Sequence, residues 1–194
     1  MANSSATTAC QTLRNLKKTN KPKLEPNLTH RVSVYMLASS ATYRFSQHFR
    51  VSAREAYEWC TDYRPDDLTL MGENGTRGIQ CLTQDTLILT EIVKVAGRKM
   101  RKLKLVKLNP SELEWYNVQL VGPNKHSEFL YKIHPEGRNA SRLDFTGLLV
   151  VYSNRKVPRN RLRRIANIER GYDSKAWVRL AKAMENDLLP KKNS

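Results

Sequence analysis

The C-terminal stretch 162–189 constrains the fold more than any other part of the chain. Its apolar residues recur at helical spacing, at Leu162, Ile165, Tyr172, Ala176, Leu180, Met184 and Leu188. Pro190 follows, a residue that is typical just beyond the end of a helix. A helix of this length would be about 40 Å long, because each residue adds about 1.5 Å. Its apolar stripe therefore requires a long concave surface, which the rest of the chain must supply.

The middle of the chain has the pattern of an antiparallel sheet. A half-buried strand is predicted at 43–51, a helix at 53–61 that begins with the capping box of Ser52 and Glu55, and a second short helix at 66–71. Six more strands are predicted at 77–82, 86–95, 99–108, 112–121, 127–134 and 141–152. Only short turns separate them, whereas parallel pairing needs long crossovers. We therefore predict an α+β fold, in which a seven-stranded, strongly curved antiparallel sheet wraps around the long C-terminal helix.

Residues 1–40 differ from the rest of the chain. They are rich in Ser, Thr, Asn and Lys, contain a single acid, Glu25, and show no lasting periodicity. This composition predicts a disordered basic tail, followed by one domain at 41–190. Two alternatives stay open: an organelle transit peptide, or a true start at Met36.

The remaining composition argues against several classes of protein. No apolar run approaches the roughly 18 residues of a membrane span. The three cysteines are odd in number and lack metal-ligand spacing, so no zinc site is expected, and a reducing, cytoplasmic location suits them best. No other metal site and no cofactor are expected.

The predicted element order resembles that of the START-like (SRPBCC) superfamily, which has a helix-grip fold and includes pollen-allergen-type proteins and polyketide cyclases. The segment 49–59 resembles the family's first strand running into its first helix, and 177–185 resembles part of its final helix. One departure is the connection 83–86, which is not the glycine-rich loop of the allergen branch, so a phosphate-cradling role is not expected there. The resemblance covers about 42–189 and implies an apolar ligand held between sheet and helix.

The alternation of the strands and the resemblance together give a set of candidate cavity residues. They are Tyr57, Leu103, Leu105, Tyr116, Tyr131, Phe145, Tyr172 and Met184. The alternative is that these side chains simply fill a solid core.

Three acids could add polar groups to such a cavity. Glu169 and Asp173 fall within the apolar face of the long helix when it is plotted at about 100° per residue. A bend at Gly171 between them could instead turn both toward solvent and surface salt bridges. Glu91 faces the interior if Leu87 and Leu89 do.

The expected function is binding of a hydrophobic small molecule or lipid in this cavity. A polyketide-cyclase or aromatase-like enzyme is the first alternative. No catalytic residue is assigned, because the four histidines have no evident partner and neither an HExxH motif nor a nucleophile elbow occurs. The sequence leaves enzyme activity open but favours a binding protein.

The charge of the chain supports a second alternative. The formal net charge is +16, from 34 Lys and Arg against 18 Asp and Glu, and the clusters 98–104 and 155–164 contain several cations and no acid. Each cluster could be a solvated face, or a contact for an anionic membrane surface or nucleic acid. A basic-surface adaptor of this kind predicts that the two clusters adjoin on one face.

Overall fold

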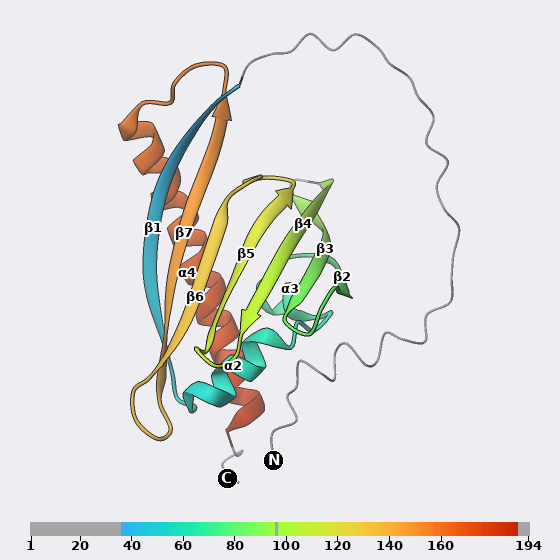
Figure 1. Ribbon diagram of the computed structural model, residues 1–194, viewed down its shortest axis with the longest axis vertical. Coiled ribbons are helices and arrows are strands. Elements are labelled where there is room, and N and C mark those ends of the chain that lie inside the picture. The colour runs from blue at the N-terminus through green and yellow to red at the C-terminus, as the bar shows by residue number, and fades with distance from the viewer. Residues whose placement is uncertain (1–35, 96, 190–194) are drawn as a thin grey trace, which may run out of the picture.

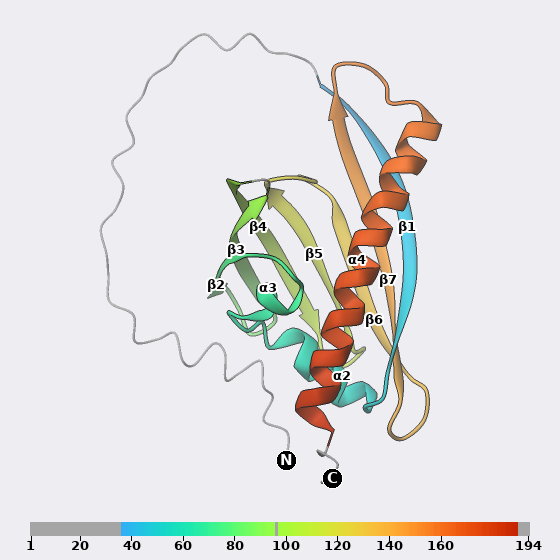
Figure 2. The ribbon, with the colours of Figure 1, turned by 180° about the vertical axis from the view of Figure 1, so that it is seen from behind.

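A single curved sheet holds the long C-terminal helix against its inner face (Figures 1 and 2). The computed structural model describes residues 36–95 and 97–189. The strands are β1 (Leu37–Phe49), β2 (Gly75–Cys81), β3 (Thr86–Val95), β4 (Arg98–Asn109), β5 (Glu114–Val121), β6 (Glu128–Pro135) and β7 (Ser141–Ser153). The helices are α2 (Ala53–Thr61), α3 (Asp67–Leu70) and α4 (Arg159–Leu188). The predicted α+β architecture is confirmed.

The seven strands are antiparallel and have the order β1-β7-β6-β5-β4-β3-β2. The first strand in the chain therefore pairs with the last, and α2 and α3 carry the chain from one edge of the sheet to the other. From β2 onward each strand pairs with the next, as the short turns predicted. α4 then packs back across the concave side, as Figure 2 shows.

The helix α2 begins with the predicted capping box. The Ser52 hydroxyl accepts from the backbone N–H of Glu55, and the Ser52 N–H donates to the Glu55 carboxylate at 3.1 Å. At the other end of the helix, Trp59 Nε1 donates to Asp187 Oδ2 at 2.9 Å. This bond fastens α2 to the last turn of α4.

Two elements begin three or more residues before the predicted position. β1 begins at Leu37 rather than at residue 43, because a strand at the edge of a sheet can pair through its backbone without an apolar pattern. The last residues of the predicted tail thus belong to the sheet. The rest of that tail lies outside the described residues, so the domain bounds stay a prediction. α4 begins at Arg159, directly after Pro158, and continues through Gly171.

The tightest core lies between α2, the sheet and the C-terminal half of α4. Trp115 stacks on Tyr131 with ring centroids 4.8 Å apart, and Trp177 tilts against Trp115 at 6.3 Å. Met184, one turn further along α4 than Leu180, is 0 % exposed. Packing is therefore dense toward the end of α4, which leaves the middle of the helix as the place where an interior space can remain. No helix in the described part of the chain has the length and apolar character to cross a membrane.

Met184→Ala tests this core. The substitution removes a fully buried side chain, so we expect the free energy of unfolding to fall by about 2–5 kcal/mol in a urea titration. Val178→Ala on the same helix is the control, because Val178 is 58 % exposed and its loss should change stability by at most about 0.5 kcal/mol. Equal effects of the two variants would contradict the position assigned to the core.

Candidate functional site: the cavity between the sheet and α4

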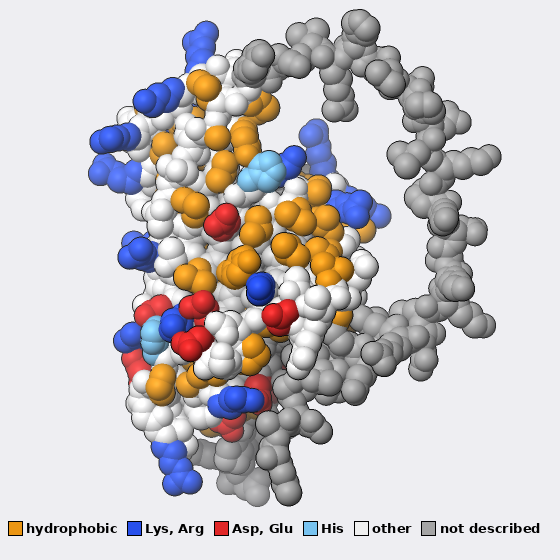
Figure 3. Space-filling view, in the orientation of Figure 1, with side chains coloured by type: hydrophobic (Ala, Val, Ile, Leu, Met, Phe, Trp, Pro, Cys, Tyr) orange, Lys and Arg blue, Asp and Glu red, His pale blue; other side chains and the backbone are white. Residues whose placement is uncertain are grey.

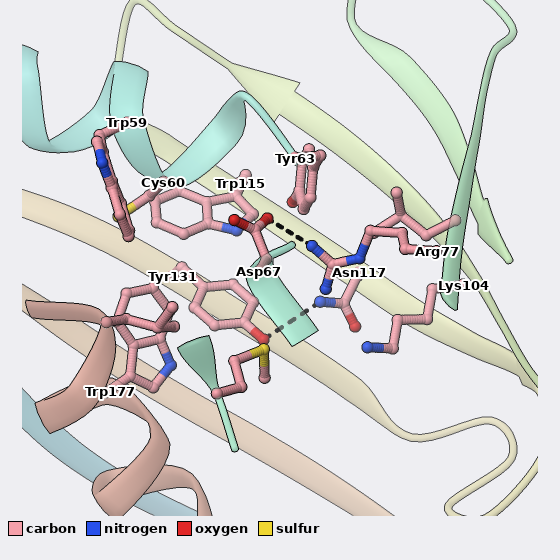
Figure 4. A pocket seen from close by; sticks show the side chains of 13 residues that line it. Trp59, Cys60, Tyr63, Asp67, Arg77, Lys104, Trp115, Asn117, Tyr131 and Trp177 are labelled. Carbon is pink, nitrogen blue, oxygen red and sulfur yellow. Dashed lines mark hydrogen bonds and ion pairs between the residues drawn. The ribbon is translucent and has the colours of Figure 1, made fainter. Parts of the chain in front are cut away.

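A cavity of about 310 Å³ lies between the inner face of the sheet and α4. A smaller space of about 90 Å³, shown in Figure 4, adjoins it. The two share the lining residues Met71, Lys104, Asn117, Tyr131 and Trp177. They are therefore neighbouring parts of one interior site, and the whole is called the cavity below.

Aromatic side chains form one wall of the cavity. Tyr131 of β6 meets Phe145 of β7 edge to face at 5.0 Å and Trp177 of α4 at 5.8 Å. Phe129 extends the same wall, 6.1 Å from Phe145. These side chains lie inward because residues of one parity on a strand share a face. The wall offers a rigid apolar surface to a ring system.

The opposite wall, on β3 and β4, centres on the buried carboxylate of Glu91. Its Oε1 lies 2.8 Å from Arg77 Nη2 and its Oε2 lies 2.9 Å from Lys104 Nζ. Arg77 Nη1 also contacts Asp67 Oδ2 at 2.5 Å (Figure 4). Burial by itself would raise the pKa of Glu91, but the charges of Lys104 and Arg77 outweigh it and lower the pKa to about 2. Glu91 is therefore ionised at neutral pH.

A second ion pair lies where the cavity meets solvent. Lys102 Nζ contacts the two oxygens of Glu73 at 3.0 and 3.1 Å. The Tyr172 hydroxyl donates to Glu73 Oε1 at 3.0 Å, although the Tyr172 side chain is largely exposed. These contacts join β4, the segment after α3 and α4 at this side of the cavity.

The third polar group is the carboxyl of Asp173, on the middle of α4. The Tyr43 hydroxyl of β1 donates to Asp173 Oδ2. Tyr43 is paired with Gly147 in the sheet, and a Cβ at Gly147 would lie 2.5 Å from the Tyr43 ring. Glycine at position 147 therefore lets the tyrosine ring cross β7 and reach α4.

Asp173 has an unusual environment for a carboxylate. Burial raises its pKa to about 6, the hydrogen bond from Tyr43 opposes that rise, and the neighbouring carboxylate of Glu169 adds to it. Glu169 lies one turn earlier on α4 and accepts from Asn124 Nδ2 at 3.3 Å. Within residues 36–95 and 97–189, neither acid forms an ion pair with Lys, Arg or His. The helix wall of the cavity is thus acidic.

The amide of Asn117 lies between the two parts of the cavity. Its Nδ2 donates to the Tyr131 hydroxyl at 3.2 Å, whereas its buried Oδ1 has no hydrogen-bond partner in the described part of the chain. The residue is 6 % exposed. Figure 4 shows this oxygen turned away from Tyr131. A buried acceptor without a donor is costly, so it is a position at which a ligand could donate.

Six of the residues named from sequence line the cavity. They are Glu91, Tyr131, Phe145, Glu169, Tyr172 and Asp173. α4 does not turn the two acids outward at Gly171, and both face the sheet. Whether any of the six contacts a ligand stays a prediction.

The expected facing of β4 and β5 is wrong. Leu103, Leu105 and Tyr116 point to the outer face of the sheet, and Tyr116 is 40 % exposed. Their neighbours Lys104 and Asn117 take the inner positions. The sequence was misleading here because Leu103 and Leu105 on β4, and Tyr116 on β5, alternate with polar residues, and it is the polar set that faces the cavity.

Two further candidates lie in the core rather than in the cavity. Tyr57 of α2 packs edge to face on Trp115 at 5.8 Å, and Met184 is fully buried beside it in the same cluster. Neither lines the cavity. These two residues are part of a filled core, as the alternative interpretation of the sequence predicted.

Sequence reasoning missed the two lysines of the inner wall, although a signal for them exists. The register of β3 against β4 places Glu91 opposite Lys102. An inward Glu91 therefore requires an inward Lys102 and, two residues on, an inward Lys104. Asn117 and Trp177 were also missed as cavity residues.

The basic clusters do not form the continuous face that an adaptor requires. Lys102 and Lys104 of the cluster 98–104 point inward and are paired with Glu73 and Glu91. On the outer face of the sheet, Figure 3 shows cations over the start of α4 and, apart from them, over the ends of β3 and β4, with hydrophobic side chains between. No group of three or more His, Cys, Asp or Glu suited to a metal ion occurs among the residues that the structure describes.

Glu91→Gln tests the inner ion-pair network. The substitution leaves Lys104 buried without its anion and Arg77 with Asp67 alone, so we expect the free energy of unfolding near neutral pH to fall by about 3–5 kcal/mol. Because the pKa of Glu91 lies below its ordinary value of 4.5, its stabilisation is complete above that pH and is lost as the pH falls toward about 2. Urea titrations across this range should show the difference from wild type shrinking. Glu128→Gln, at an exposed site on β6, is the control, and a pH-independent difference would contradict the assignment.

Comparison with known proteins identifies the fold of the chain but no family at the level of sequence. No family model matches the chain, and no curated protein matches it in sequence. Three solved structures resemble it closely in shape. The Zhui aromatase/cyclase from Streptomyces sp. R1128 aligns with a TM-score of 0.66 at 12% identity, over 80% of this chain and 100% of that one.

The other two are a START superfamily protein from Mycobacterium smegmatis and the protein Ara h 8.0201. The first has a TM-score of 0.58 at 17% identity, covering 75% of this chain and 97% of the other. The second has a TM-score of 0.57 at 8% identity, covering 76% and 99%. Identities this low establish the fold alone. The predicted resemblance is confirmed at that level: the chain has the START-like helix-grip fold.

Proposed function

We propose that this protein binds an apolar small molecule in the cavity between the sheet and α4. The observation that carries the proposal is the interior space of about 310 Å³ with one aromatic wall, built from Tyr131, Phe145 and Trp177. A space of this kind stays open only if the surrounding side chains cannot collapse into it. Here the strands on one side and a continuous helix on the other hold the walls apart.

The size of the cavity limits the ligand. Ligand pockets typically range from about 300 to 1,000 Å³, so this one suits a compact molecule such as a fused-ring compound better than a lipid with two long chains. Burial of about 300 Å² of apolar ligand surface would supply about 7 kcal/mol. Association costs reduce this gain, and we expect dissociation constants of about micromolar order.

Binding of the neutral apolar dye Nile red tests the proposal. We expect its fluorescence to rise on binding wild-type protein, and Ala176→Phe to abolish the rise by filling the cavity, because Ala176 lies in its wall and is 3 % exposed. Ile168→Phe on the same helix is the matched control, since Ile168 is 61 % exposed. Circular dichroism establishes that both variants fold. Absence of dye binding to the wild type, or equal binding by both variants, would refute the proposal.

A cyclase or aromatase-like enzyme is the second candidate. The observation that favours it is the Asp173 carboxyl, whose raised pKa of about 6 and contact with Tyr43 suit a group that exchanges protons near neutral pH. In the corresponding reaction of a poly-β-ketone, a methylene carbon bonds to a carbonyl carbon within the same molecule, and water leaves. The likeness to the Zhui aromatase/cyclase supports the same candidate.

Mass spectrometry separates the two candidates. If the protein is a cyclase, incubation with a linear poly-β-ketone should yield a product that is one water lighter, faster than without protein, and Asp173→Asn should slow its formation by at least about a hundredfold. Glu128→Gln should leave the rate unchanged. If the protein binds the ketone but does not accelerate the loss of water, the cyclase function is excluded and the binding function stands.

A further inference from the structure

The charges that line the cavity do not balance. Its carboxylates are Asp67, Glu73, Glu91, Glu169 and Asp173, and its cations are Arg77, Lys102 and Lys104. Five carboxylates against three cations leave an excess of two negative charges among the lining residues when all are ionised, or of one when Arg64, which lies 3.6 Å from Asp67 outside the lining, is counted. This interior excess is opposite in sign to the chain as a whole, which has a formal charge of +16.

The pairing of these groups shows which carboxylates are in excess. Lys102 forms an ion pair with Glu73 at 3.0 Å, and Lys104 forms one with Glu91 at 2.9 Å. Arg77 contacts both Asp67 and Glu91. All three cations are thereby used on the sheet side. Glu169 and Asp173, on α4, receive only the neutral donors Asn124 and Tyr43.

A second feature of the cavity is a hydrogen-bond acceptor that lacks a donor. Asn117 lines both parts of the cavity, and its buried Oδ1 atom accepts no hydrogen bond from the described residues. An amide oxygen and two carboxylates are all acceptors. A ligand that filled the cavity would therefore meet an apolar aromatic wall and unmet acceptors.

From this arrangement we infer that the cavity selects an apolar molecule carrying a protonated amine, which places its ammonium group against Glu169 and Asp173. The inference rests on the proposed binding function and specifies the class of ligand. The aromatic side chains Tyr131 and Phe145 accommodate the rest of the molecule and also favour a cation near their faces. Charge-assisted hydrogen bonds to carboxylates supply the selectivity.

An anionic ligand is the main competitor, and the geometry disfavours it. A carboxylate or phosphate could be neutralised only by Lys102, Lys104 or Arg77, and each of these would first have to leave a buried carboxylate behind. Leaving a buried charge unpaired costs more than a new pair returns. The anion would in addition face the uncompensated acids of α4.

A matched series of three compounds tests the inference. Naphthylmethylamine, naphthylmethanol and naphthylacetate share one ring system and differ in the charge of a single group, and each is titrated against bound Nile red. We expect the amine to bind at least about tenfold more tightly than the alcohol, and the acetate to bind most weakly. Binding to the basic outer surface would give the reverse order, so the series also separates the cavity from the surface.

Substitutions on α4 locate the effect. Glu169→Gln combined with Asp173→Asn should remove the preference for the amine over the alcohol, which is measured as the ratio of the two affinities in the same variant. Circular dichroism shows whether the variant is folded. Glu169→Gln alone keeps the Tyr43–Asp173 hydrogen bond, and it replaces the double variant if that variant does not fold. It should reduce the preference for the amine over the alcohol. Glu128→Gln, on the outer face, is the control for loss of one negative charge.

The possible outcomes are distinguishable. If Nile red and the alcohol bind but the amine has no advantage, or if the acetate binds best, the inference is overturned and the proposed binding function stands. If the amine preference survives in the double variant, the cation is recognised elsewhere and the inference is also overturned. If neither the dye nor any compound of the series binds, the proposed function fails and the inference fails with it.

Discussion

The buried carboxylate of Glu91, held between Arg77 and Lys104, is the interaction on which the rest of the interior depends. It joins β2, β3 and β4 on their inner faces and, through Asp67, ties α3 to the sheet. A carboxylate can be kept in such a place only with both cations present, since its burial would otherwise raise its pKa and drive it to the neutral form. The network therefore places charged side chains on the inner face of these strands, while Leu103 and Leu105 of β4 lie on the outer face.

The cavity follows from the difference between this polar half of the sheet and the aromatic half. On β5, β6 and β7, Trp115, Tyr131 and Phe145 pack against each other and against α4. On β4, Lys102 and Lys104 pair with Glu73 and Glu91. The space between the halves is bounded on the helix side by Glu169 and Asp173. Tyr43 reaches Asp173 only because Gly147 leaves room for its ring.

Much of the fold could be predicted from local patterns. The capping box at Ser52 placed α2, and the turn residues between the strands separated them at almost the observed bounds. The stripe of α4 correctly implied a concave sheet. Prediction of the site was weaker where the interior is polar. On β6 and β7 the predicted inward residues, such as Tyr131 and Phe145, do face in, whereas Leu103, Leu105 and Tyr116 of β4 and β5 face out.

The sequence by itself determined the order, type and approximate length of the elements, because helix periodicity, strand alternation, caps and turns are local properties of neighbouring residues. It also determined that an acid at position 91 must share its face with Lys102 and Lys104, because the hairpin register is local. Only the tertiary structure decided that this charged face is the inner one. That choice depends on the contacts of Arg77, Asp67, Glu73 and α4, residues far apart in the chain whose charges balance only once they are folded together.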